Sequence, residues 1–176
     1  MILATHAIAG AAVAALISNR PVLAFVAGAA SHFLLDAIPH WDYELQSKQE
    51  DEKDPLNNDM AIGRDFWFDL IKLGGDTLIG LVLGWFFFRS FFTDYGLLGF
   101  FTFAAGITGG LLPDALQFAY FKLRSPWLTA LQRFHHFIHA DHDRKLKPLV
   151  GIVSQVLLVT TIILAVKIII AVILNQ

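Results

Sequence analysis

Long apolar runs, separated by shorter polar segments, dominate the chain. The runs cover residues 2–18, 21–38, 65–88, 96–121 and 148–174. Each is close to the roughly 20 apolar residues that an α-helix needs to cross the hydrocarbon core of a bilayer. The pattern therefore predicts an all-α protein, a polytopic membrane helix bundle of about five transmembrane helices.

Two segments depart from this pattern. Residues 126–142 place apolar side chains at helical spacing beside polar neighbours: Trp127, Leu128, Leu131, Phe134 and Ile138. We expect an amphipathic helix at the membrane interface there. Residues 46–59 are strongly polar and contain Pro and Asn, which is typical of a solvated loop.

Composition agrees with a membrane location. Hydrophobic residues make up 56% of the 176 residues and charged residues 16%, with a mean hydropathy of +0.58. A soluble domain is less apolar and more highly charged. The length and the lack of a linker-like segment predict a single domain. The net charge of -2 provides no basic patch, so nucleic acid is not an expected partner.

Alternating the direction of consecutive helices brings the ionisable residues to one side of the membrane. All seven histidines of the chain fall on that side. Lysine and arginine are concentrated there as well, whereas only Arg20 and Arg89 flank the predicted spans on the other side. The positive-inside rule makes the histidine-rich side cytoplasmic. We therefore expect a multi-pass inner-membrane protein whose N-terminus and polar residues face the cytoplasm.

The second apolar run carries the most regular pattern of polar residues. His32, Asp36 and His40 follow one another at intervals of four, which places them on one helix face. Pro39 is expected to break the helix, so that His40 and Asp42 lie on a turn that folds back over the site.

Other runs repeat this arrangement. Ionisable residues recur at helical spacing as follows: Asp65, Asp69, Lys72 and Asp76 in the third run, Asp114 in the fourth, His6 in the first, and His135 and His139 in segment 126–142. His136 points about 100° away from the face that His135 and His139 share. Glycines lie one turn from several of these residues, at Gly10, Gly28, Gly106 and Gly110, and are expected to permit close helix packing.

So many ionisable groups near membrane spans indicate a bound cation. A single interfacial His or Asp is explained by capping a helix or bonding a headgroup, but each such group inside a span costs about 2.5 to 3.5 kcal/mol. Cysteine is absent, which leaves imidazole and carboxylate as ligands. We predict two or more divalent metal ions, Zn first and Mn or Mg as alternatives, held by His6, His32, Asp36, Asp76, Asp114, His135 and His139.

Several short motifs resemble those of a known family. They are THAIAG near the start, SHFLLDAIPHWD closing the second run, GLLPD in the fourth run and a late His-rich helix. With them the chain resembles the membrane-bound metal-dependent hydrolases, an inner-membrane family that includes LexA-regulated members. The resemblance implies metal-dependent hydrolysis, and the matching polar positions are His6, His32, Asp36, Asp114 and the late histidines. The HRGxTHS-like motif of many members is missing, and FHHFIHADHD stands in its place.

We therefore expect hydrolysis of a phosphoester in a membrane lipid or lipid-linked substrate, by metal-activated water at the cytoplasmic interface. Asp42 or His40 would act as general base or acid, and Arg64 or Lys72 would attract the phosphate. Two alternatives use the same residues: a transporter of a metal ion or proton-coupled solute, and a metal-stabilised scaffold without catalysis. The far halves of the predicted spans contain few polar groups, which favours a one-sided site and so an enzyme.

Overall fold

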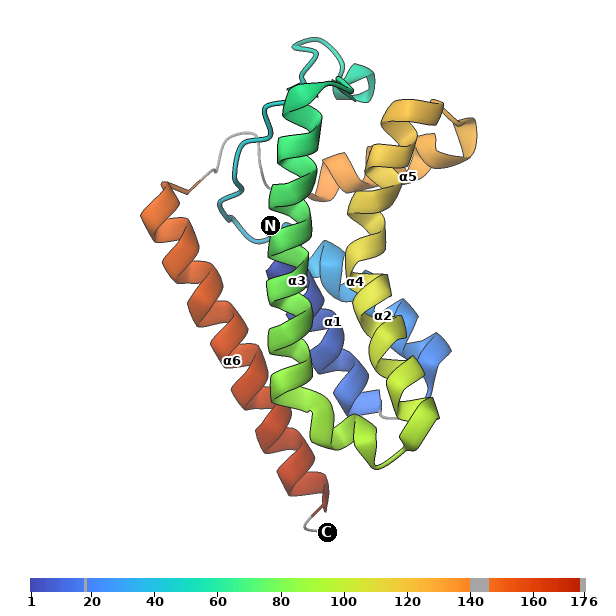
Figure 1. Cartoon of the computed structure of the whole chain (residues 1–176), viewed down its shortest axis with the longest axis vertical. Helices are drawn as coiled ribbons and strands as arrows, with labels where there is room; N and C mark the ends of the chain where they lie inside the picture. Colours follow the sequence, from blue (N-terminus) through green and yellow to red (C-terminus); the bar gives the residue numbers. More distant parts are fainter. Residues whose placement is uncertain (18, 140–145, 175–176) are drawn as a thin grey trace.

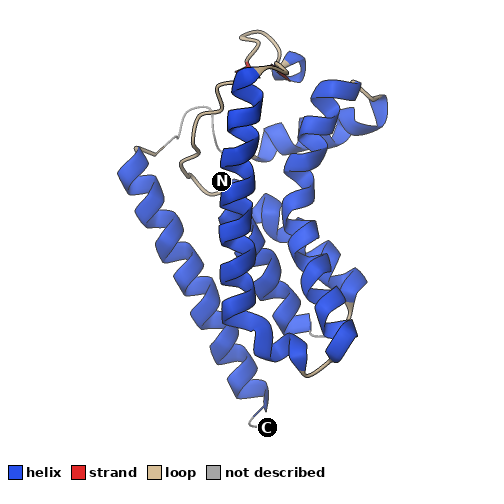
Figure 2. Ribbon diagram, viewed as in Figure 1, coloured by secondary structure: helices blue, strands red, loops and turns tan. Residues whose placement is uncertain are grey.

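The computed structural model describes residues 1–17, 19–139 and 146–174. Within these ranges the backbone forms six α-helices, one 3-10 turn and one pair of two-residue strands (Figure 1). In chain order they are α1 (Leu3–Ile17), α2 (Pro21–Asp36), β1 (Lys48–Gln49), η1 (Pro55–Asn57), β2 (Asp59–Met60), α3 (Arg64–Thr93), α4 (Gly96–Leu123), α5 (Pro126–Ile138) and α6 (Pro148–Leu174). Figure 2 shows that helix dominates the described chain, which confirms the all-α prediction.

Three helices are long and apolar enough to cross a membrane: α3 with 30 residues, α4 with 28 and α6 with 27. The prediction of five such spans is wrong in number, because α1 has only 15 residues and α2 only 16. At a rise of about 1.5 Å per residue these two helices measure about 23 and 24 Å, against about 30 Å for a hydrocarbon core.

The local sequence explains why the two apolar helices are short. α2 ends at Asp36 instead of residue 38, because Pro39 follows closely and a residue before proline avoids helical backbone. At the other end, Arg20 is the N-cap of α2 and Pro21 is its first residue. Proline suits that position, since the first N–H of a helix has no partner within the helix.

The central helix of the bundle is α1, which packs against α2, α3, α4 and α6. Its side chains are mostly small, and Ala7, Ala11, Ala12 and Ala14 are completely buried. They belong to one hydrophobic cluster with larger side chains from the longer helices, such as Phe88 of α3. Neighbouring helices thus enclose α1, which is compatible with its short length.

Glycines bring α1, α2 and α4 into backbone contact. A Cβ atom added to Gly10 would lie 2.4 Å from the carbonyl oxygen of Gly106, and one added to Gly28 would lie 2.2 Å from the same oxygen. No methyl group fits at such distances. The predicted role of glycine in close helix packing is therefore confirmed, and it draws together the polar residues one turn away.

The first turn of α1 lies well inside the bundle (Figure 1). The backbone N–H of Ala4 donates to Asp76 Oδ2 at 3.2 Å. Asp76 comes about three turns after Arg64, the first residue of α3, which corresponds to about 18 Å along the helix axis. The first turns of α3 therefore extend well beyond the level at which α1 begins.

The polar segment between α2 and α3 is anchored on α4. Its strands β1 and β2 pair antiparallel. Lys122 Nζ donates to Asp59 Oδ1 at 2.7 Å, and Arg124 Nη2 donates to the carbonyl oxygen of Asn58 at 2.8 Å. Two cations of the predicted cytoplasmic side thus stabilise this segment.

Candidate metal centre

Asp36, the last residue of α2, lies at the centre of a buried polar cluster. Its side chain is 1% exposed, and both carboxylate oxygens have ionisable neighbours. Oδ2 lies 3.0 Å from His32 Nε2 and 3.2 Å from His135 Nε2. Oδ1 lies 3.1 Å from His6 Nε2 and 3.0 Å from the amino nitrogen of Met1. One carboxylate therefore faces two groups of potential ligands.

Four ligand atoms of this cluster have the mutual spacing of a tetrahedral metal site: His32 Nε2, Asp36 Oδ2, Asp114 Oδ1 and His135 Nε2. Five of their six separations are 3.0, 3.2, 3.3, 3.8 and 3.8 Å, and the sixth, between the two carboxylates, is within 4.8 Å. Ligands bound tetrahedrally at about 2.0 to 2.1 Å from a zinc ion lie about 3.3 Å apart. The four residues could therefore hold a divalent cation after small shifts.

The backbone of α4 fixes the tautomer of His32. Its Nδ1 lies 2.8 Å from the carbonyl oxygen of Gly110, which can only accept, so Nδ1 carries the hydrogen and donates it. In the neutral imidazole, Nε2 then presents its lone pair to the cluster, as a metal ligand must. Close packing makes this contact possible, since a Cβ on Gly110 would lie 2.7 Å from the carbonyl oxygen of His6.

His135, the fourth residue of this set, comes from α5. This helix buries two polar residues, Gln132 and His135, while Trp127 and Phe137 are 91% and 85% exposed. A helix in the predicted amphipathic segment is thus confirmed, although it ends at Ile138. Residues 140–145, which include His142 and Asp143, lie outside the described residues.

The turn after α2 brings further ligands to Asp36. His40 is 3% exposed, and its Nδ1 lies 2.7 Å from the carbonyl oxygen of Ile38, so Nδ1 is again the donor. Nε2 of His40 lies 3.1 Å from Asp42 Oδ2 and 2.8 Å from the amino nitrogen of Met1. The predicted fold-back of this turn over the site is confirmed.

His139, which follows α5, faces the same turn. Its Nε2 lies 3.8 Å from Asp36 Oδ2 and 4.0 Å from Asp42 Oδ2. Burial lowers the pKa of His139 to about 3, so this imidazole is neutral near pH 7. Burial alone raises the pKa of Asp42, but the hydrogen bond with His40 and the charge of the amino group outweigh it and hold that pKa well below its usual range. A neutral imidazole and an ionised carboxylate are the forms that bind metals.

His6 is completely buried at the start of α1. Its ring stacks on the ring of His32, with centroids 4.0 Å apart. Among the residues that the structure describes, neither ring nitrogen of His6 has a hydrogen-bond partner, although Nε2 lies 3.1 Å from Asp36 Oδ1. Buried polar side-chain atoms rarely lack a partner, so His6 has the environment of a metal ligand.

The structure thus brings together most of the residues that the sequence suggested: His6, His32, Asp36, Asp114, His135 and His139, with His40 and Asp42 beside them. Asp76 has a different place. Its Oδ2 accepts from the backbone N–H of Ala4 at 3.2 Å and from the hydroxyl of Tyr43 at 3.1 Å. Asp76 therefore caps the first turn of α1, and in the described ranges it belongs to neither group of converging ligands.

The two predicted phosphate-binding cations differ in position. Arg64 lies about 18 Å from Asp76 along α3, and its guanidinium stacks over the ring of Phe68. Lys72 lies one turn from Asp76, and its Nζ donates to the carbonyl oxygen of Glu44 at 2.9 Å. Lys72 is therefore bound to the turn that follows the ligands of α2, next to Tyr43, and Arg64 lies farther along α3.

Gln155 of α6 supports the site and was not singled out from the sequence. It is 3% exposed, and its Oε1 accepts from the backbone N–H of Ile2 at 3.2 Å and from the Thr5 hydroxyl at 3.3 Å. Its Nε2 donates to the carbonyl oxygen of Trp41 at 2.7 Å. The sequence could have pointed to Gln155, because its polar amide lies inside an apolar run and an amide is costly to bury without hydrogen-bond partners.

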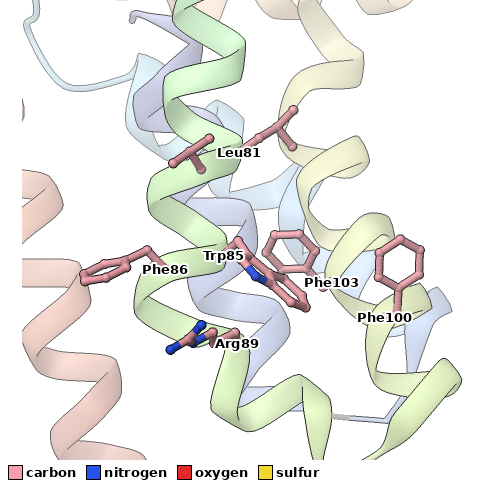
Figure 3. A pocket seen from close by; sticks show the side chains of 7 residues that line it. Leu81, Trp85, Phe86, Arg89, Phe100 and Phe103 are labelled. Carbon is pink, nitrogen blue, oxygen red and sulfur yellow. The ribbon is translucent and has the colours of Figure 1, made fainter.

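A surface hollow elsewhere on the molecule has a different character (Figure 3). Its lining is apolar apart from one guanidinium, and consists of Leu81, Val82, Trp85, Phe86, Arg89, Phe100 and Phe103. None of these side chains belongs to the His/Asp cluster. We therefore assign the hollow no part in the candidate metal centre.

Comparisons with family models, with curated proteins and with solved structures find no match to this chain. The structure itself defines the class: an all-α protein in which three of the described helices are suited to spanning a membrane. It also carries buried His/Asp groups that could hold a metal ion.

Proposed function

We propose that this protein is a membrane-bound metal-dependent hydrolase that cleaves a phosphoester in a membrane lipid or lipid-linked substrate. The observation that carries the proposal is the convergence of His32, Asp36, Asp114 and His135, whose ligand atoms all lie within 4.8 Å of one another. The resemblance of the sequence motifs to metal-dependent hydrolases points in the same direction.

The donor set suits a divalent transition metal. Two carboxylates balance two positive charges, and two imidazoles favour Zn over Mg or Mn, which prefer oxygen ligands. Gly110 keeps the lone pair of His32 directed at the cluster. A divalent ion bound there would supply Lewis acidity and an activated water near neutral pH.

Two carboxylates of the cluster are partly exposed, and a catalytic site needs such access. The side chains of Asp114 and Asp42 are each 30% exposed, whereas those of Asp36 and His32 are 1% and 0% exposed. Water and substrate would approach along the side of the two partly exposed carboxylates. A purely structural metal site would be closed by its ligands.

Asp42 fits the role of general base better than His40. Its carboxylate is 30% exposed, so it can contact a water that His40 cannot reach and accept a proton from it. His40 is enclosed, and its Nδ1 is committed to the carbonyl oxygen of Ile38. Lys72, one turn from Asp76, is the cation that we propose attracts the phosphate.

The surroundings of the cluster support a lipid substrate. α5 turns His135 inward while Trp127 and Phe137 face outward, an arrangement suited to a helix in the headgroup region. Lipid headgroups carry phosphoesters to that depth, whereas a peptide bond would have to be brought there. From the distribution of Lys and Arg we propose the inner membrane, with the cluster on the cytoplasmic side.

Phosphate release from defined lipids tests the proposal. Protein purified in detergent without chelator would be assayed with a diacylglycerol phosphate and a polyprenyl phosphate in mixed micelles, with Zn²⁺ or Mn²⁺ added. We expect metal-dependent phosphate release that Asp36→Asn abolishes. His136→Ala is the matched control, because His136 neighbours His135 in α5 but belongs to neither group of converging ligands.

Metal-loaded protein that releases no phosphate from either lipid would overturn the assignment. Zinc flux in proteoliposomes without hydrolysis would then indicate a transporter. Bound metal with neither flux nor hydrolysis would indicate a scaffold.

A further inference from the structure

We propose that the Asp36 carboxylate bridges two divalent cations, the first bound together with His32, Asp114 and His135 and the second together with His40 and His139. The inference rests on the proposed metal-dependent function and deepens it. It makes His40 a metal ligand and the site a two-metal centre, a class of site used for phosphoester cleavage.

The two oxygens of Asp36 face different neighbours, as in a bridging carboxylate. Oδ2 lies 3.0 Å from His32 Nε2 and 3.2 Å from His135 Nε2. Oδ1 lies 3.1 Å from His6 Nε2 and 3.0 Å from the amino nitrogen of Met1, which in turn lies 2.8 Å from His40 Nε2. His139 Nε2 lies 3.8 Å from Oδ2. A single metal ion would bind one carboxylate oxygen of Asp36. It would not account for the imidazoles and the amino group around the other oxygen.

The second set of ligands consists of two imidazoles and one carboxylate, which are residue types that bind divalent metals. Asp36, His40 and His139 each offer an atom within 4.8 Å of the atoms offered by the other two. The rings of His40 and His139 lie 4.9 Å apart. Because His40 Nδ1 donates to the carbonyl oxygen of Ile38, the nitrogen left for a metal is Nε2, which points into this space.

The position between these ligands already accommodates a cationic group. The amino nitrogen of Met1 lies 3.0 Å from Asp36 Oδ1 and 2.8 Å from His40 Nε2. Zinc binds such atoms at about 2.0 to 2.2 Å, so the ligands would move inward by less than about 1 Å as the ion replaced the amino group.

His6 provides an independent indication that a ligand belongs beside Oδ1. Its ring is completely buried with Nε2 3.1 Å from Asp36 Oδ1, and in the described part of the chain Nδ1 has no hydrogen-bond partner. His6 is not part of the first group of ligands, which are His32, Asp36, Asp114 and His135, so a single metal there would not use the His6 imidazole. A second ion next to Oδ1 would give one of these nitrogens a partner.

Metal stoichiometry tests the inference on the full chain in detergent. Elemental analysis after loading with Zn²⁺ should give about two equivalents per chain for the parent protein and for His136→Ala. His40→Ala should retain about one equivalent, and so should His135→Ala, which removes a ligand of the first site. Asp36→Asn should lose both metal ions, because the Asp36 carboxylate is the proposed ligand that the two ions share.

Loading with Mn²⁺ provides a measurement that needs no variant. Two manganese ions bridged by a carboxylate should give an exchange-coupled electron paramagnetic resonance spectrum, and His40→Ala should give the spectrum of an isolated ion. If His40→Ala fails to fold, His40→Gln serves as the second variant, and the parent spectrum still decides.

The outcomes separate this inference from the proposed function. One equivalent in the parent protein, lost in His135→Ala and kept in His40→Ala, would overturn the second site and leave the hydrolase proposal standing. No metal in any form of the protein would overturn both.

Discussion

Gln155 of the last helix donates a hydrogen bond from its side-chain amide to the carbonyl oxygen of Trp41 at 2.7 Å. The same amide accepts from the backbone N–H of Ile2 and from the hydroxyl of Thr5. One buried side chain therefore ties α6 both to the start of α1 and to the turn that carries the ligands after α2.

Replacing Gln155 by Leu should loosen the cluster without unfolding the helices. The change leaves the carbonyl of Trp41 and the N–H of Ile2 without partners, at about 1 to 3 kcal/mol for each group that stays buried. Zinc affinity measured by chelator competition and thermal stability in detergent should both fall. Thr161→Val is the control, because the Thr161 hydroxyl bonds only within α6, to the carbonyl oxygen of Leu157. Equal zinc affinities for the two variants would show that Gln155 does not position the site.

Asp36→Asn and Asp114→Asn should each lower metal affinity by more than about 100-fold. Both changes keep the side-chain size and remove a charged ligand. Removing a residue that merely orients a metal ligand already lowers metal affinity by about 10- to 100-fold. Asp51→Asn and Asp54→Asn are matched controls in the polar segment, where both carboxylates accept hydrogen bonds from groups within six residues of them. If metal binding survives Asp36→Asn and Asp114→Asn but fails in Asp51→Asn and Asp54→Asn, the site lies elsewhere in the chain.

Asp76 should behave as a cap and not as a ligand. In Asp76→Asn the amide oxygen can still accept from Ala4 and Tyr43, so metal content should stay at the parent level. Asp76→Ala removes the acceptor and should destabilise the protein by about 0.5 to 2 kcal/mol. Thermal unfolding and elemental analysis of both variants would decide. Loss of metal in Asp76→Asn would restore Asp76 to the ligand set.

Gly28→Ala should disrupt the site from a distance. The new methyl group would lie 2.2 Å from the carbonyl oxygen of Gly106, so α2 and α4 must separate. Overpacking of this kind costs about 1 to 3 kcal/mol, and here it also moves His32 away from Gly110. The control is Gly74→Ala on α3, where an added Cβ meets nothing within 4 Å. A drop in melting temperature and zinc affinity should follow only the first change.

The two ends of the bundle should lie on opposite sides of a membrane. The chain has no cysteine, so single cysteines can report their own accessibility. Glu52→Cys lies in the polar segment before α3, and Asp94→Cys lies in the turn between α3 and α4. An impermeant thiol reagent should label the first only from the cytoplasmic side and the second only from the other side. Labelling of both from one side would refute α3 as a span.

Local geometry made part of this protein predictable from its sequence. A helix repeats about every 3.6 residues, so the spacing of His32 and Asp36 places them on one face whatever surrounds them. Proline restricts the residue before it, so the turn after α2 followed from Pro39. Glycine one turn from a polar residue permits close approach, and Gly28 and Gly110 are used in that way.

The tertiary structure alone decided which of these faces meet. Asp76 and Asp114 look alike in the sequence, yet one caps α1 and the other converges on His32 and His135. The difference arises because the axial position of each helix depends on packing against its neighbours, which no periodicity within one helix specifies. For the same reason Gln155, more than 110 residues from Trp41 in the chain, became a support of the site only when α6 packed beside α1.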